Sequence, residues 1–202
     1  MKKKELEILL QKVPTYEQPN PFIEQYMTPA DIAADIIYTA FQYDDILDKK
    51  IVDLGCGTGI FSFGAKIANA KEVIGIDIDE KSINIAKKYA QENNTDIQFI
   101  VKDVKEVDIK CDTVIMNPPF GAQKSNRWAD RSFIEKGFEI AKVIYTLHLT
   151  KTIDFIEKMI SSLDGKITLY KKYDFTIKHS FTFHKKKSQN VEITLLRIIT
   201  KN

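Results

Sequence analysis

The sequence predicts a doubly wound α/β fold, in which a mostly parallel sheet is covered by helices on both faces. From Lys50 onward, short apolar segments alternate with longer segments of helical periodicity. This alternation is typical of parallel strands joined by right-handed crossovers. After Gly165 the alternation ends, and two successive strand-like segments predict a closing antiparallel hairpin.

The expected elements follow from periodicity and from the positions of proline. A short amphipathic helix covers Lys3 to Lys12 and ends before Pro14, and a second helix covers Ala30 to Phe41. We expect Thr28 to cap the second helix, with Pro29 at its first position. The expected strands are Ile51–Leu54, Glu72–Ile76, Ile97–Val101, Thr113–Met116, Val143–Leu149, Lys166–Asp174 and Val191–Thr200. The remaining helices begin near Ile60 and cover Glu80–Asn93, Ser132–Ala141 and Thr152–Leu163.

The composition limits the function. The formal net charge is only +2, so any contact with nucleic acid must come from local patches and not from the overall field. Cys56 and Cys111 have no metal-ligand spacing with the three histidines, and we predict neither a metal site nor a disulfide. The sequence has no signal peptide and no run of about 18 apolar residues, so we expect a cytoplasmic protein without a membrane segment.

A glycine-rich turn follows the first expected strand. Asp53-Leu54-Gly55-Cys56-Gly57-Thr58-Gly59 stands where a doubly wound sheet binds a nucleotide-like ligand, and Ile60 begins the next helix. The glycines let the backbone approach a ligand closely. Their spacing is GxGxG, without the GxGxxG that prepares a helix terminus for a pyrophosphate, which favours a ligand without phosphates. A tight turn with no ligand is the alternative.

Two acidic residues follow the next two strands. Asp77 comes about 20 residues after the glycine turn, where a carboxylate can accept hydrogen bonds from both hydroxyls of a ribose. Asp103 and the amide of Val104 suit the edge of an adenine ring, although a single acid in a loop is more often a capping residue. Together with the glycine turn, these residues predict an adenosine-type cofactor.

The fourth expected strand runs into Asn117-Pro118-Pro119-Phe120. The prolines remove backbone donors and hold the chain extended, which leaves a rigid set of oxygen acceptors. The N6 amine of adenine is a poor nucleophile because its lone pair is delocalised into the ring. If the Asn117 side-chain oxygen and the Pro118 carbonyl accept its hydrogens, the lone pair can face the methyl group of a sulfonium. Phe120 would stack on the base. The alternative is a plain strand-ending turn.

With these motifs the sequence resembles the methyltransferase-like protein 5 family, whose members are adenine N6-methyltransferases of small-subunit ribosomal RNA that use S-adenosylmethionine. The likeness spans nearly the whole chain. The glycine turn and Asn117 to Phe120 are shared with many amine methyltransferases. The segments Glu24-Gln25-Tyr26, with Thr28, and Phe183-His184-Lys185-Lys186-Lys187-Ser188 are more particular to this family.

The resemblance implies a Rossmann-like class I methyltransferase fold of seven strands, the last one antiparallel. It implies a catalytic loop made of Asn117, Pro118, Pro119 and Phe120. The implied cofactor contacts are Gln25, Thr28, Gly55, Thr58, Ile60, Asp77, Asp103 and Val104. The motifs add Gly57, Gly59 and Asn117 to the expected cofactor site. It also implies a small zinc-ribbon activator protein at the sheet edge Ile97–Val101. Between Ala122 and Arg131 the sequence departs from the family.

Basic and aromatic residues crowd the last hairpin. Lys171, Lys172 and Lys178 precede Phe181, Phe183 and a basic run. This mixture suits RNA through phosphate neutralisation and stacking, whereas a solvated charged face is the alternative. The expected RNA contacts are Phe120, Lys124, Arg127, His184, Lys185, Lys186 and Lys187.

We expect residues 1–202 to form a single domain, as the length and the 44% hydrophobic content allow. Residues 1–48 would form an N-terminal helical segment and cofactor lid. Residues 49–165 would form the cofactor-binding and catalytic core, and residues 166–202 the closing hairpin with its basic loop.

Other activities stay open at this point. An NPP motif followed by an aromatic residue also serves the methylation of protein glutamine or of DNA adenine. The chain could instead be an inactive, cofactor-dependent RNA-binding subunit, although the intact loop from Asn117 to Phe120 weighs against this. A nicotinamide oxidoreductase is disfavoured by the missing GxGxxG.

Overall fold

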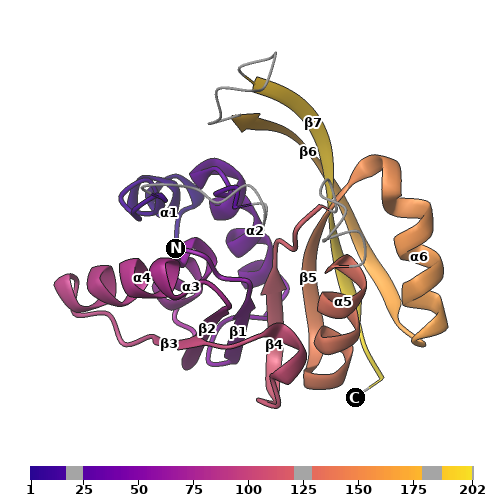
Figure 1. Cartoon of the computed structure of the whole chain (residues 1–202), viewed down its shortest axis with the longest axis horizontal. Coiled ribbons are helices and arrows are strands. Elements are labelled where there is room, and N and C mark those ends of the chain that lie inside the picture. Colours follow the sequence, from indigo (N-terminus) through magenta and orange to yellow (C-terminus); the bar gives the residue numbers. More distant parts are fainter. Residues whose placement is uncertain (17–24, 121–128, 179–187, 202) are drawn as a thin grey trace.

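The computed structural model describes residues 1–16, 25–120, 129–178 and 188–201. Seven strands within these residues form one sheet (Figure 1). They are β1 (Lys50–Leu54), β2 (Glu72–Asp77), β3 (Gln98–Val101), β4 (Cys111–Met116), β5 (Ala141–Leu149), β6 (Lys166–Lys178) and β7 (Ser188–Ile199). Their order across the sheet is β3-β2-β1-β4-β5-β7-β6. Strands β1 to β5 pair in parallel, and β7 is antiparallel to both β5 and β6, which confirms the predicted sheet.

Helices cover both faces of the sheet, as predicted (Figure 1). They are α1 (Lys3–Leu10), α2 (Ala30–Gln42), α3 (Ile60–Ile67), α4 (Glu80–Glu92), α5 (Ala129–Ile140) and α6 (Ile153–Ser162). Helices α1 to α4 contribute to the core on one face, and α5 and α6 contribute to the core on the other. Within the described ranges, none of these helices has the length and apolar character needed to cross a membrane.

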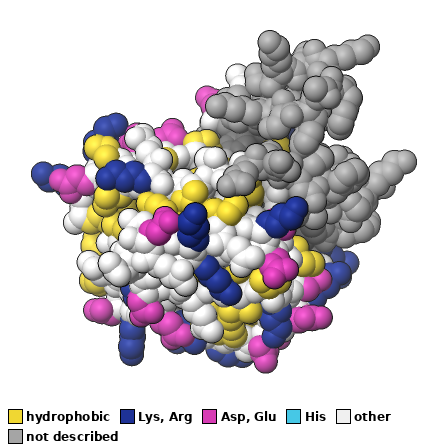
Figure 2. Space-filling view, turned by 60° about the vertical axis from the view of Figure 1, so that its left-hand side comes forward, with side chains coloured by type: hydrophobic (Ala, Val, Ile, Leu, Met, Phe, Trp, Pro, Cys, Tyr) yellow, Lys and Arg dark blue, Asp and Glu magenta, His cyan; other side chains and the backbone are white. Residues whose placement is uncertain are grey.

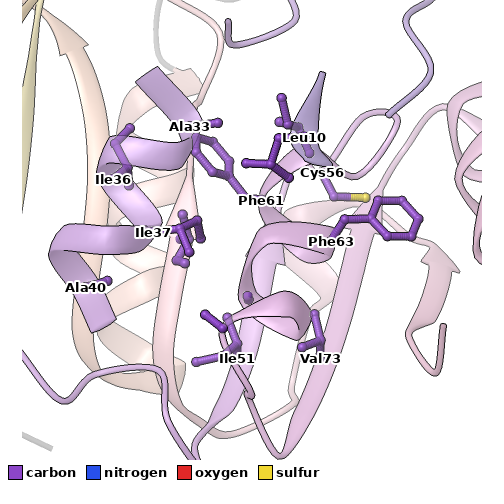
Figure 3. Close-up of a cluster of buried hydrophobic side chains, with 14 of the residues drawn as sticks. Leu10, Ala33, Ile36, Ile37, Ala40, Ile51, Cys56, Phe61, Phe63 and Val73 are labelled. Atoms are coloured by element: carbon purple, nitrogen blue, oxygen red, sulfur yellow. The ribbon is translucent and has the colours of Figure 1, made fainter. Parts of the chain in front are cut away.

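The core beneath α1 to α4 joins the N-terminal helices to the first strand. Leu10 of α1, Ile37 of α2 and Phe61 of α3 lie in one cluster with Ile51 of β1 (Figure 3). Their exposure is between 0% and 4%. Burying an apolar side chain of this size contributes about 1.5–3 kcal/mol. The N-terminal segment with α1 and α2 is therefore packed into the core of the fold.

The second core lies on the opposite face of the sheet. Ile134 of α5 and Ile160 of α6 pack with Val52 and Leu54 of β1 and with Val114 of β4. Because side chains alternate between the two faces of a strand, β1 serves this core with Val52 and Leu54 and the other with Ile51. Coverage of both faces explains why the central strands are so rich in apolar residues.

The start of α2 differs from the expectation. The helix begins at Ala30 with Pro29 as its N-cap residue and without a side-chain capping bond, so the predicted cap by Thr28 is wrong. The Thr28 hydroxyl instead accepts a hydrogen bond from the Asn117 side chain at 3.1 Å. A tertiary contact therefore takes the place of the local cap.

The C-terminal half departs from the expected boundaries in two places. Helix α5 begins at Ala129, before the predicted start at Ser132, and β5 follows it directly from Ala141. The hairpin strands are longer than predicted because β6 and β7 pair along their whole length, up to the register pair Lys178 and Ser188. Their far ends project beyond the rest of the sheet (Figure 1).

A buried ion pair fixes the chain after α2 to the sheet. The Asp45 carboxylate accepts hydrogen bonds from Arg197 Nε at 2.7 Å, from Arg197 Nη2 at 3.1 Å and from the Tyr145 hydroxyl at 2.6 Å. The Arg197 guanidinium also lies 4.5 Å from the centre of the Tyr43 ring. The side chains of Arg197 and Asp45 are only 10% and 9% exposed. Because such charges are stable only as a pair, the pair ties the N-terminal segment to β5 and β7.

The effects of removing the two partners should therefore not be additive. We predict that Arg197→Met lowers the free energy of unfolding by about 3–5 kcal/mol, since it leaves the Asp45 carboxylate buried without its cation. The double variant Asp45→Leu/Arg197→Met should lose less than the sum of the two single losses. Urea unfolding of the four proteins measures this, and strictly additive losses would contradict the proposed coupling.

Candidate active site

A pocket enclosing about 260 Å³ lies where β1, β2 and β4 end. This is the edge at which a doubly wound sheet binds its ligand. The predicted site residues that line it are Gln25, Thr28, Gly55, Thr58, Ile60, Asp77, Asp103, Val104, Asn117 and Pro119. Residues separated by many positions in the sequence are thus brought together around one cavity.

Other predicted site residues do not border the pocket. Gly57 and Gly59 shape the turn beneath it, and Pro118 is not part of its lining. Phe120 packs against the core that α1 to α4 share. The predicted RNA contacts Lys124, Arg127, His184, Lys185, Lys186 and Lys187 lie outside the described residues.

The glycine turn is held in a conformation that favours glycine. Gly55, Gly57 and Gly59 have φ values of 71°, 54° and 94°. The amides of Gly55 and Cys56 donate to the Ile76 carbonyl at 2.8 and 3.0 Å, which joins the turn to β2. A Cβ atom on Gly57 would overlap the Tyr16 hydroxyl oxygen. A side chain at Gly57 would therefore require Tyr16 to move and would hold a positive φ.

The carboxylate of Asp77 is fixed by the backbone around it. Its Oδ2 accepts a hydrogen bond from the Gly57 amide at 2.7 Å, and its Oδ1 accepts one from the Asp79 amide at 2.9 Å. Burial raises the pKa of Asp77, and these backbone donors partly offset that effect. A carboxylate has about four acceptor positions, so two amide bonds leave capacity for ribose hydroxyls.

Gln25 and Asp103 both have structural partners at the pocket. Gln25 Nε2 donates to Asp79 Oδ2 at 2.8 Å, and Asp79 in turn accepts from the Ser82 amide at the start of α4. Asp103 Oδ1 accepts from the Lys105 amide at 2.9 Å and caps the short 3-10 helix Val104–Glu106. Asp103 is thus a capping residue and also lines the pocket, so both of its expected roles are compatible with one position.

Asn117 presents an unpaired oxygen at the end of β4. Its Nδ2 donates to Thr28 Oγ1 at 3.1 Å. Its Oδ1 is buried and has no hydrogen-bond partner among the residues that the structure describes. A buried acceptor without a partner carries a desolvation cost that a bound donor removes. The site therefore holds an acceptor suited to an amine.

Several lining residues were not among the predicted site residues, and Tyr16, Phe133 and Ile78 are three of them. Tyr16 and Phe133 come from segments without a recognisable motif, and they reach the pocket only because the chain folds back on itself. Ile78 lines the pocket and is 59% exposed, and its position directly after Asp77 was the one available signal. Burial strongly raises the pKa of Tyr16, and the negative charge of Asp77 adds to that effect. Among the described side chains, no group of His, Cys, Asp and Glu gathers in a way that could hold a metal ion.

Asp53 lies below the glycine turn. Its Oδ2 accepts from the Ser62 amide at 2.9 Å and from the Ser62 hydroxyl at 2.6 Å. Its Oδ1 is buried without a partner among the described residues. Burial raises the pKa of Asp53 to about 7, and the bonds from Ser62 oppose this rise.

We predict a pH-dependent effect of Asp53→Asn on stability. The raised pKa means that the folded protein retains a proton which the unfolded chain loses near its ordinary pKa of 3.8, so Asp53 lowers the free energy of unfolding as pH rises towards 7. The asparagine does not titrate. Relative to the parent, the variant should therefore become more stable between about pH 4 and pH 8. Urea unfolding across this range measures the difference, and a difference independent of pH would show the assignment to be incorrect.

We predict that Gly57→Ala weakens binding of S-adenosylhomocysteine. A positive φ costs a non-glycine residue about 1–2 kcal/mol, and the new methyl group would meet the Tyr16 hydroxyl. The double variant Gly57→Ala/Tyr16→Phe, which removes that oxygen, should recover part of the affinity. Isothermal titration calorimetry distinguishes the variants. Parent affinity in Gly57→Ala alone would be inconsistent with this geometry.

Comparison with known proteins agrees with the site. A model of the methyltransferase small domain matches residues 20–142. The rRNA N(6)-adenosine-methyltransferase METTL5 of Danio rerio is 37% identical over 98% of this chain and 98% of its own length. Its counterpart in Drosophila melanogaster is 32% identical over 98% of this chain and 96% of its own. A crystal structure of a Pyrococcus horikoshii protein superposes with a TM-score of 0.91 at 35% identity, covering 99% of this chain and 98% of that one.

These relatives confirm the expected family and exclude the nicotinamide oxidoreductase. S-adenosylmethionine is therefore the cofactor of this protein, as expected. The similarity extends over nearly the entire chain, including the segments before and after the matched domain. The chain belongs to the methyltransferase small domain family and, within it, to the METTL5 family of rRNA N(6)-adenosine-methyltransferases.

Proposed function

We propose that the protein methylates the N6 amine of an adenosine in ribosomal RNA, most specifically in the RNA of the small subunit. The observation that carries the proposal is the buried, unpaired Oδ1 of Asn117 at the edge of the cofactor pocket. The names of the relatives from Danio rerio and Drosophila melanogaster support an adenosine of ribosomal RNA as the methyl acceptor. Because ribosomal RNA is the proposed substrate, we also propose a cytoplasmic location.

The residues of the loop position the amine. Bound S-adenosylmethionine supplies an electrophilic methyl group on a sulfonium. Asn117 Oδ1 and the Pro118 carbonyl accept the two hydrogens of N6, so the nitrogen lone pair is directed towards that methyl group. The prolines keep the acceptors rigid because they lack backbone donors and have a fixed φ. Thr28 holds the Asn117 amide by accepting from Nδ2, which leaves the oxygen for the substrate.

Replacement of Asn117 tests this role. We predict that Asn117→Ala lowers kcat for RNA methylation by about 10²-fold or more, because a preorganised acceptor is lost, while the affinity for S-adenosylhomocysteine stays close to that of the parent. Thr28→Val, which keeps the shape but removes the acceptor of Asn117 Nδ2, should lower kcat less. Full turnover by Asn117→Ala would refute the mechanism.

A labelling experiment identifies the molecule that receives the methyl group. The protein is incubated with labelled S-adenosylmethionine and, in separate reactions, with small-subunit ribosomal RNA, DNA and total protein, and each product is digested. We expect label in N6-methyladenosine from the RNA. Label in glutamine or in DNA adenine would favour the alternative acceptors, and no label with intact cofactor binding would favour an inactive RNA-binding subunit.

Charges of both signs occur together on the described surface of the protein. Lys and Arg side chains are interspersed with Asp and Glu on the face shown in Figure 2. On β6, Lys171 Nζ lies 2.5 Å from Asp35 Oδ2, and Lys172 Nζ lies 2.9 Å from Glu192 Oε1. These two lysines are therefore partly neutralised within the protein. We propose that the RNA-binding charge comes mainly from the other predicted contacts, Lys124, Arg127 and His184 to Lys187.

We also propose that a small zinc-ribbon activator protein pairs with the β3 edge of the sheet. Strand β3 has β2 as its neighbour on one side and ends the sheet on the other. Val101 is 45% exposed there, and Ile100 is partly buried. An apolar strand at a sheet edge favours pairing with another chain.

The activator proposal predicts low activity for the isolated chain. Addition of the zinc-ribbon subunit should raise both cofactor affinity and the methylation rate, and Val101→Asp should reduce this gain because it places a charge in the interface. Lys158→Ala, a change at an exposed position on α6, which packs beside β6 at the other end of the sheet, serves as the control. Full cofactor binding and normal turnover by the chain alone would exclude an obligatory activator.

A further inference from the structure

A buried polar pair lies beside the catalytic loop and outside the cofactor pocket. His148 on β5 is 0% exposed, and its Nδ1 lies 3.6 Å from Oδ1 of Asp130 in the first turn of α5. Both atoms are buried, and neither has a hydrogen-bond partner among the residues that the structure describes. Two polar groups that face each other unpaired in the interior require an explanation.

The other ring nitrogen of His148 has a partner. Nε2 lies 2.9 Å from the hydroxyl oxygen of Thr146, which is also fully buried. A neutral imidazole has one donor and one acceptor nitrogen. If Thr146 donates to Nε2, the ring proton is on Nδ1 and faces the Asp130 carboxylate. Thr146 is then bonded to His148, and the Nδ1 proton of His148 faces Asp130 Oδ1 across 3.6 Å without a hydrogen bond.

The pair lies close to the reacting end of the site. Thr146 is the register partner of Met116, the residue before Asn117, so His148 comes two residues further along the neighbouring strand. One helical turn after Asp130, α5 carries Phe133, which lines the pocket with Asn117. A Cβ atom on Gly55 would lie 2.9 Å from the Phe133 ring, so this ring is already in close contact with the glycine turn.

We propose that His148 and Asp130 form a clasp that holds the start of α5 against β5 in the working enzyme and thereby positions Phe133 at the reacting end of the pocket. The gap of 3.6 Å is about half an ångström longer than an ordinary N–H···O hydrogen bond. Such bonds often tighten only in the complex with substrates. Closure satisfies both unpaired atoms at once. His148 and Asp130 are thus positioning residues, and their kinetic role rests on the proposed methylation of RNA.

Kinetics of Asp130 variants test the clasp. Asp130→Ala should lower kcat for RNA methylation by about tenfold or more, since small displacements of positioning groups cost this much, with little change in KM for RNA. Asp130→Asn keeps an oxygen acceptor for the Nδ1 proton and should stay close to the parent. Ile134→Val removes buried volume from the same helix and is the control for lost stability, which should lower the Tm but not kcat.

The outcomes separate positioning from a structural role. A parent-like kcat in Asp130→Ala would overturn the proposal. It would also be overturned if Asp130→Asn were as impaired as Asp130→Ala, or if Ile134→Val lost as much kcat at an equal drop in Tm. All assays are run at a temperature where each variant remains folded.

The tautomer of His148 provides a test that does not need methylation. In the complex with S-adenosylhomocysteine, ¹⁵N NMR should show the His148 proton on Nδ1 and an unprotonated Nε2, and Asp130→Ala should shift the proton towards Nε2. A proton on Nε2 in the parent would refute the clasp. If the parent methylates no RNA, the proposed function is wrong. The tautomer of His148 still tests the clasp in that case, because its measurement does not depend on methylation.

Discussion

The proposed chemistry depends on the hydrogen bond between Asn117 and Thr28, two residues that are 89 positions apart in the sequence. An asparagine amide has a donor end and an acceptor end, and the environment decides which end faces the ligand. Because Thr28 takes the donor end, the buried oxygen remains without a partner among the described residues. We propose that this oxygen is an acceptor held in place before any amine arrives, and such preorganisation is usually the largest contribution of a protein to catalysis of this kind.

This bond in turn requires that the N-terminal segment be fixed to the sheet. Asp45 and Arg197 join the chain after α2 to β7. On α2 itself, Asp35 accepts from Lys3 of α1 at 2.9 Å and from Tyr173 of β6 at 2.7 Å. Although burial opposes it, these bonds and that of Lys171 lower the pKa of Asp35, so the carboxylate stays charged. A lid role for residues 1–48 remains a prediction, but several of their contacts hold Thr28 near Asn117.

The chemistry of the site was more predictable from the sequence than its geometry. The glycine turn, Asp77 and Asn117 each carry a residue type that suits the proposed reaction, at the end of a strand, and parallel strands bring those ends together. Tyr16 and Phe133 have no such mark, because their places in the pocket come from tertiary packing. Thr28 shows the opposite case, since its sequence context favours a helix cap while the fold uses its hydroxyl for Asn117. The roles predicted for His184 to Lys187 stay predictions.

The most direct measurement is a crystal structure with S-adenosylhomocysteine and an adenosine-containing RNA bound together. We expect Asn117 Oδ1 to lie about 2.7–3.2 Å from N6 of the adenine, with Nδ2 still bonded to Thr28 and the amine directed at the sulfur. An adenine amine beyond the reach of Asn117, or an amide turned so that Nδ2 faces the base, would contradict it.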